Sequence, residues 1–142
     1  YADQMLKNAR AICETFKNNG FKVVTGGTDT PLVMIDLSDK NFNGHQAQVF
    51  LENLDICCNK NLIPNDKRSP QETTGIRMGV SAITTRGFDE VSCIEVANLI
   101  ITALDSLNND SVTDELKVFI KNKVSKLSEK FPLYPFEIGC LD

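Results

Sequence analysis

The fold is decided by residues 73–88, TTGIRMGVSAITTRGF. Three apolar side chains alternate within this stretch and predict a strand with one buried face: Ile76, Met78 and Val80. The opposite face carries Arg77 and Gly79, so a permanent cation projects beside a glycine that lets another group approach closely. An arginine in this setting is most often a surface residue, but the same combination also builds an anion site. Arg77 is therefore the first candidate binding residue.

Downstream of this strand the sequence predicts a turn and two helices. Residues 83–87 predict the turn, and a helix begins near Phe88, capped by Asp89 or by a threonine hydroxyl. Its apolar positions recur at helical spacing as far as about Leu107. A last helix carries its apolar stripe from residue 116 to 127 and ends before Pro132.

Upstream, the pattern predicts a helix followed by a hairpin. Residues 1–19 have the spacing of an amphipathic helix, and Gly20 stands where a left-handed C-terminal cap is expected. Residues 21–25 and 32–37 predict two strands, joined by a turn at 26–31. The strand pair is expected to be antiparallel.

Between the hairpin and the central strand, the sequence predicts a polar break at 41–44 and a helix of about three turns, with His45 in its first turn and apolar positions from 47 to 54. A loop is predicted over 59–73. The lone histidine, His45, is expected to be an exposed side chain, with no catalytic or metal role. The element order predicts an α/β fold of the α+β two-layer kind, with a small, mostly antiparallel sheet and helices on one face. We expect a single domain over residues 1–142.

Composition limits the classes of function. The net charge is −4, from 15 basic and 19 acidic residues, which argues against nucleic acid as a partner. Five cysteines lack the spacing of a zinc site or of a C-x-x-C pair, so reduced thiols in a cytosol-like compartment are expected. The longest apolar runs are too short for a membrane span, and no membrane partner is expected. Because the chain starts at Tyr1 within a helical pattern, we expect a piece of a longer protein.

Residues 58–87, CNKNLIPNDKRSPQETTGIRMGVSAITTRG, resemble the C-terminal region of serine hydroxymethyltransferases, a family of pyridoxal-phosphate enzymes. In that family the arginine of a G-[IL]-R-x-G element binds the carboxylate of the amino-acid substrate, and the matching position is Arg77. The second asparagine of an N-K-N-x-x-P element hydrogen-bonds the pterin of folate, and the matching position is Asn61. An amide offers one acceptor and two donors, which suits the mixed edge of a pterin. The chain departs from the family at Pro31, where a histidine is usual.

The resemblance implies the small C-terminal domain of a fold-type I pyridoxal-phosphate-dependent transferase. The implied reaction interconverts serine plus tetrahydrofolate and glycine plus 5,10-methylenetetrahydrofolate. The family's cofactor lysine belongs to a larger preceding domain, so the resemblance implies no catalytic residue in this chain and no activity for the chain alone. It further implies a homodimer or homotetramer, in the cytoplasm or, as alternatives, in a mitochondrion or plastid.

The residues by themselves leave a second function open. A free-standing module could bind an amino acid or another small carboxylate through Arg77 without any associated chemistry.

Overall fold

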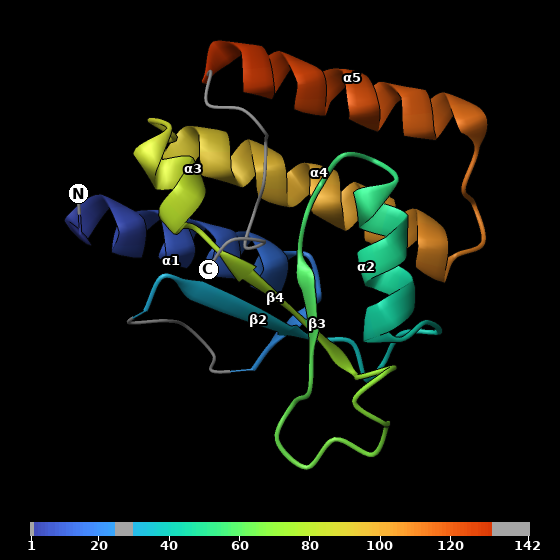
Figure 1. Ribbon diagram of the computed structural model, residues 1–142. Helices are drawn as coiled ribbons and strands as arrows, with labels where there is room; N and C mark the ends of the chain where they lie inside the picture. The colour runs from blue at the N-terminus through green and yellow to red at the C-terminus, as the bar shows by residue number, and fades with distance from the viewer. Residues whose placement is uncertain (1, 25–29, 132–142) are drawn as a thin grey trace.

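The computed structural model describes residues 2–24 and 30–131, so most of the turn predicted at 26–31, and Pro132, lie outside the described residues. The described chain forms an α+β fold in which helices cover one face of a small antiparallel sheet (Figure 1). The strands are β1 (Lys22–Val23), β2 (Leu32–Asp36), β3 (Asn59–Asn61) and β4 (Gly75–Gly79). The helices are α1 (Ala2–Asn18), α2 (Gly44–Glu52), α3 (Ser81–Thr85), α4 (Glu90–Asn108) and α5 (Asp114–Lys130). The predicted fold class is confirmed.

The sheet has the order β1-β2-β4-β3, with every neighbouring pair antiparallel. In the register of β2 and β4, Ile35 lies opposite Ile76 and Val33 lies opposite Met78. These four side chains are at most 1% exposed and form the inner face of the sheet. The alternation read from the sequence therefore gives the correct buried face of β4.

Helices α1 and α4 lie over the inner face of the sheet, and α5 lies on the far side of α4 (Figure 1). The apolar stripe of α1 enters the core, with Ile12 and Phe16 buried. Gly20 has φ +84°, and the N–H of Phe21 donates to the carbonyl of Phe16 at 3.0 Å. This is the left-handed helix cap predicted for Gly20, and it directs the chain into β1.

One predicted helix start agrees with the structure, and two predicted loops differ from it. Helix α2 starts at Gly44, about where the sequence predicts, and Asn43 and Gln46 form a reciprocal capping box there. Residues 59–61 were expected in a loop but form the edge strand β3, since strand pairing overrides their polar composition. Residues 81–85 form the short helix α3, where a turn was expected at 83–87.

The threonine hydroxyls of α3 do not cap the next helix. Thr84 and Thr85 donate to carbonyls four residues back, at Val80 (2.7 Å) and Ser81 (2.9 Å). Asp89 is the N-cap of α4, and its carboxylate accepts from the N–H of Ser92 at 2.9 Å. Of the two caps proposed from sequence, the aspartate is therefore the correct one.

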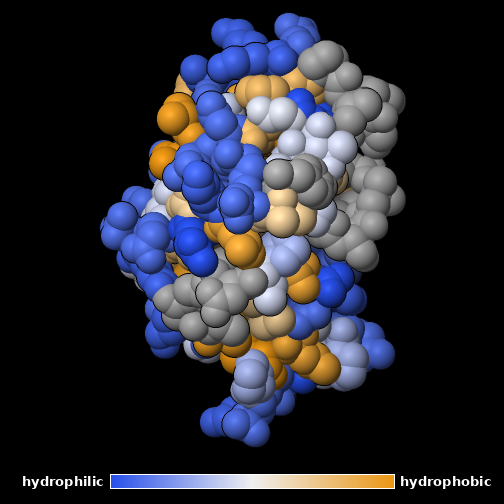
Figure 2. Space-filling view, turned by 90° about the vertical axis from the view of Figure 1, so that its left-hand side faces the viewer, coloured by the Kyte–Doolittle hydropathy of each residue, from blue (hydrophilic) through white to orange (hydrophobic). Residues whose placement is uncertain are grey.

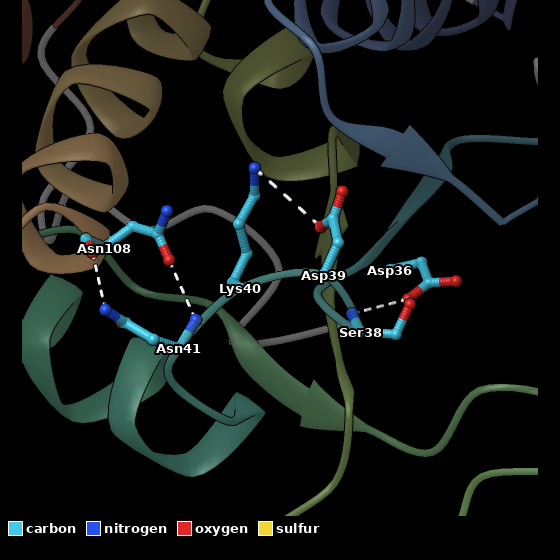
Figure 3. Close-up of polar contacts among 6 residues, drawn as sticks. All are labelled: Asp36, Ser38, Asp39, Lys40, Asn41 and Asn108. Atoms are coloured by element: carbon cyan, nitrogen blue, oxygen red, sulfur yellow. Dashed lines mark hydrogen bonds and ion pairs between the residues drawn. The ribbon is translucent and has the colours of Figure 1, made fainter.

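The segment between β2 and α2 ties the sheet to the end of α4 (Figure 3). The N–H of Ser38 donates to Asp36 at 2.8 Å and turns the chain after β2. Asn41 then donates from its backbone and its side chain to Asn108, at 2.8 and 2.6 Å. These two bonds fix where α2 begins relative to the last turn of α4.

The cysteines differ from the expectation of five reduced thiols. Cys13, Cys58 and Cys93 are free and buried, whereas Cys57 is disulfide-bonded. Burial, with smaller contributions from neighbouring carboxylates, raises the pKa of Cys58 and of Cys93 to about 12. Helices of the described residues include none that is long and apolar enough to cross a membrane.

Candidate functional site

The outer face of the sheet, which the helices leave uncovered, carries the candidate site. Strand register places Asn59 of β3, Arg77 of β4 and Met34 of β2 side by side in one row across this face. Asn61 lies two residues further along β3, opposite Gly75, and is therefore on the same face as Arg77. The structure thus brings together the two residues that the sequence nominated from separate motifs.

Arg77 is half-buried at the centre of that row. Within residues 2–24 and 30–131, its guanidinium has neither a hydrogen-bond partner nor an ion-pair partner. The lack of an internal partner distinguishes Arg77 from a structural arginine, which would be tied to carbonyls or carboxylates of its own domain. The arrangement can offer a fork of N–H donors to a carboxylate that approaches the outer face.

The glycines beside Arg77 have a packing role that the sequence did not reveal. Gly75 is buried, and a Cβ there would lie 2.8 Å from Ile63 Cγ2 and 2.9 Å from the carbonyl oxygen of Asn61. Gly79 is also buried. Gly75 therefore allows β3 and the chain after it to pack closely on β4.

Asn61 is partly exposed, and its amide is engaged only locally. Its Nδ2 donates to the carbonyl of Leu62 at 3.0 Å and lies 3.7 Å from the sulfur of Met34. The contact with sulfur is a weak hydrogen bond. The hydrogen-bonding groups of the amide are thus not occupied by the core of the domain. A ligand-binding role requires this.

The chain between β3 and β4 folds around Asp66. Its carboxylate accepts from the N–H groups of Ile63 (3.2 Å) and Arg68 (2.9 Å), and from both the N–H (2.8 Å) and the hydroxyl (2.5 Å) of Thr74. Desolvation raises the pKa of Asp66, but these hydrogen bonds outweigh it and lower the pKa to about 2. Asp66 therefore fastens the loop to the residue that precedes β4.

The same loop contacts the start of α2. The N–H groups of Gly44 and His45 donate to the carbonyls of Thr73 (3.0 Å) and Glu72 (2.8 Å). A side chain at Gly44 would collide with Thr73 and with the carbonyl of Gly75. The start of β4, two residues before Arg77, is consequently held both by Asp66 and by the start of α2.

Arg86, the other arginine of the motif, lies outside the site. Its Nε and Nη2 both donate to the carbonyl of Phe131, at 2.9 and 2.5 Å, which joins α3 to the end of α5. Burial lowers its pKa. The ring of Phe131 packs on that of Phe88, with centroids 4.3 Å apart. Arg86 is therefore a structural residue.

His45 is exposed, as expected, and lines a groove of 580 Å³ between α2 and the end of α4. Groups of three or more His, Cys, Asp or Glu side chains that could hold a metal are absent from the described part of the chain. Sequence reasoning missed Asn59 and Asp66. Asn59 could be found only by recognising β3, whereas the Pro-Asn-Asp turn at 64–66 already signals an aspartate that bonds nearby N–H groups.

Comparison with known proteins agrees with these motifs. The family model described as serine hydroxymethyltransferase matches residues 1–100, which include both Asn61 and Arg77. The match extends over all four strands and reaches into α4. The chain belongs to the serine hydroxymethyltransferase family.

Proposed function

We propose that this chain provides the substrate-carboxylate and folate contacts of an enzyme that interconverts serine plus tetrahydrofolate and glycine plus 5,10-methylenetetrahydrofolate. The observation that carries the proposal is the half-buried Arg77, which has no partner within the described residues and shares its face with Asn61. The family match supports the same assignment. Arg77 binds the carboxylate of serine or glycine, and Asn61 hydrogen-bonds the pterin.

Arg77 is suited to this task by geometry as well as by charge. Its direct cross-strand neighbours, Asn59 and Met34, carry no carboxylate. Asp36 is diagonal to Arg77 on the same face, but it accepts from the N–H of Ser38 and forms no ion pair with Arg77 within the described residues. A planar guanidinium can form two parallel hydrogen bonds to a carboxylate, which fixes the orientation of the amino acid. Orientation of the substrate relative to a reactive group is itself a large part of catalysis.

Asn61 is suited to a heteroaromatic ring that presents donors and acceptors together. Because its Nδ2 bonds only to a neighbouring carbonyl and a thioether, the amide can exchange these contacts at small cost. The amide is thereby available to the edge of a flat ring.

Pyridoxal phosphate, the cofactor of the family, supplies the electron sink when bound. The residues described do not fit its attachment: every lysine among residues 2–24 and 30–131 is exposed or partly exposed, and none is enclosed as a Schiff-base lysine is expected to be. The proposal therefore places the cofactor lysine in another, larger domain and treats residues 1–142 as the small C-terminal domain. The chain alone is then inactive, and the intact cytoplasmic enzyme is a homodimer or homotetramer.

The test is Arg77→Lys in the intact enzyme. Lysine keeps the charge but loses the two parallel hydrogen bonds, so kcat/KM for serine should fall roughly 10²-fold, equivalent to about 3 kcal/mol. The KM for tetrahydrofolate should stay unchanged. Unaltered serine kinetics would remove Arg77 from the substrate site, and serine binding by residues 1–142 alone would favour the free-standing module.

A further inference from the structure

The loop between β3 and β4 borders a partly open cavity that the proposed function does not use. Its volume is 370 Å³, which is enough for a small ligand. The residues that line it come from the turn after β2 and from the loop: Ser38, Ile63, Asn65, Lys67, Arg68 and Thr74. The lowest part of the molecule, where this loop lies in Figure 1, is hydrophilic in Figure 2.

Arg68 is the unusual member of this lining. Its Nη1 is buried and, within residues 2–24 and 30–131, donates to no acceptor. Buried side-chain nitrogens have a partner in the large majority of cases, so an orphaned one calls for an explanation. The residue as a whole is only half-buried and forms part of the cavity wall. A ligand that brings an acceptor into the cavity would explain the orphaned nitrogen.

Asp66, two residues before Arg68, forms no ion pair with its guanidinium within the described residues. Both oxygens of Asp66 accept from N–H and hydroxyl groups of the loop, as described above, including the backbone N–H of Arg68 itself. Lys67 is exposed beside it and adds a second positive charge to the lining. The cavity wall therefore contains two cations and no carboxylate among its lining residues.

The loop backbone is held in a fixed shape around the cavity. Asn65 and Thr73 have φ values of +59° and +57°, a region that a β-branched threonine rarely adopts. Thr73 is kept there by its hydrogen bonds to Ser69, Gly44 and Gly75. Residues held in such conformations concentrate at ligand clamps and active sites.

We propose that this cavity binds a small oxyanion, namely a carboxylate or phosphate group, through the guanidinium of Arg68. Lys67 adds long-range attraction. The backbone N–H of Ser38 is already used by Asp36 (Figure 3), and its hydroxyl remains as a further donor. The site is distinct from Arg77 and does not depend on the function proposed above.

The test is an NMR titration of the 142-residue chain, which contains a single continuous core, with inorganic phosphate and, separately, with glutarate. Sodium chloride keeps the ionic strength constant. Amide shifts at residue 38 and residues 63–74 should saturate. Any shifts at residues 76–78 belong to the separate site at Arg77 and should fit a different affinity. Tighter binding of phosphate identifies a phosphate-bearing ligand, and tighter binding of glutarate identifies a carboxylate.

Variants separate this site from general attraction to positive charge. Arg68→Gln should weaken binding about tenfold or more, because it removes the charge and the fork of donors. Arg68→Lys should give an intermediate affinity. This conservative variant keeps the test valid if Arg68→Gln fails to fold. Lys121→Gln, at an exposed position of α5, should bind as the parent chain does.

Arg77→Lys should leave the shifts at residue 38 and residues 63–74 unchanged. The anion site at Arg68 and the substrate site at Arg77 can therefore be disproved independently. The proposal is overturned if the shifts scatter over the lysines of α5 or survive in folded Arg68→Gln. It is equally overturned if neither anion produces saturating shifts in the loop.

Discussion

Asn61 and Arg77 project from the same face of the sheet, on neighbouring strands. Asn59 is the direct partner of Arg77, and Asn61 follows it by two residues along β3, so the two side chains are diagonal neighbours. Such neighbours lie about 7–8 Å apart at the backbone. A substrate carboxylate at Arg77 and a ring at Asn61 could therefore be bound at the same time on one surface.

The first prediction concerns Asn61→Asp in the intact enzyme. Aspartate has nearly the same shape but no donors, so the KM for tetrahydrofolate should rise roughly 10- to 100-fold, as expected when a ligand's polar group loses its partner. Steady-state kinetics with each substrate varied in turn measures this. Because the new carboxylate is diagonal to Arg77 and competes for its guanidinium, the KM for serine should rise as well. Asn61→Leu, which adds no charge, should raise the KM for tetrahydrofolate alone.

A matched control is Asn53→Asp at the exposed C-cap of α2, which should leave both constants unchanged. If the KM for tetrahydrofolate were the same in Asn61→Asp and the parent enzyme, Asn61 would not contact the pterin.

The inner face of the sheet was predictable because it depends on local alternation. Ile76 and Met78 alternate with Arg77 and are fully buried, whereas Arg77 is only half-buried. Strand β3 was not predictable in this way. Its three residues, Asn-Lys-Asn, have no apolar side chain, and they pair with β4 only because the long loop returns the chain to that edge.

The candidate site was predictable in its residues but not in its geometry. The sequence nominated Arg77 and Asn61 separately, and only the β3–β4 register shows that they share a face. The sequence did not indicate that Gly75 is packed against Ile63. Such packing depends on a contact between residues that are far apart in the sequence, which periodicity does not encode.

The second prediction concerns Arg86→Lys. Lysine cannot reproduce the two hydrogen bonds from Nε and Nη2 to the carbonyl of Phe131. We expect the free energy of unfolding to fall by about 1 kcal/mol, because the group is partly exposed, and the melting temperature by roughly 4 °C. Thermal unfolding followed by circular dichroism measures it. Lys121→Arg, at an exposed position of α5, is the control, and an equal effect of both variants would argue against the specific role of Arg86.

The third prediction concerns the free thiols. Burial raises the pKa of Cys58 and Cys93 to about 12, so almost no thiolate is present at pH 7.5. In the folded chain, both should react with iodoacetamide at least roughly 10²-fold more slowly than in urea. Peptide mass spectrometry over time measures each rate. Rapid modification of either thiol in the folded chain would show that it is more accessible than the structure indicates.

The last prediction uses Asp66 to test how the loop is fastened to β4. Its pKa is lowered to about 2 from an ordinary value of 3.8. A carboxylate whose pKa is lowered on folding stabilises the folded state above its unfolded pKa, and loses that contribution as the pH falls through its folded pKa. The contribution of Asp66 should therefore be complete above about pH 5 and decline between about pH 4 and pH 2.

Asp66→Asn removes the charge and places an amide nitrogen among the donors of Ile63, Arg68 and Thr74. At pH 7 the variant should be less stable by about 1 kcal/mol, a value reduced for solvent exposure, as measured by urea unfolding. The difference should shrink as the pH is lowered toward 2, because the parent carboxylate then becomes protonated. Asp39→Asn, which removes only a 3.8 Å surface ion pair with Lys40, should have little effect at any pH. A deficit in Asp66→Asn that stayed constant down to pH 2 would show that the shape of the side chain, and not its charge, holds the loop.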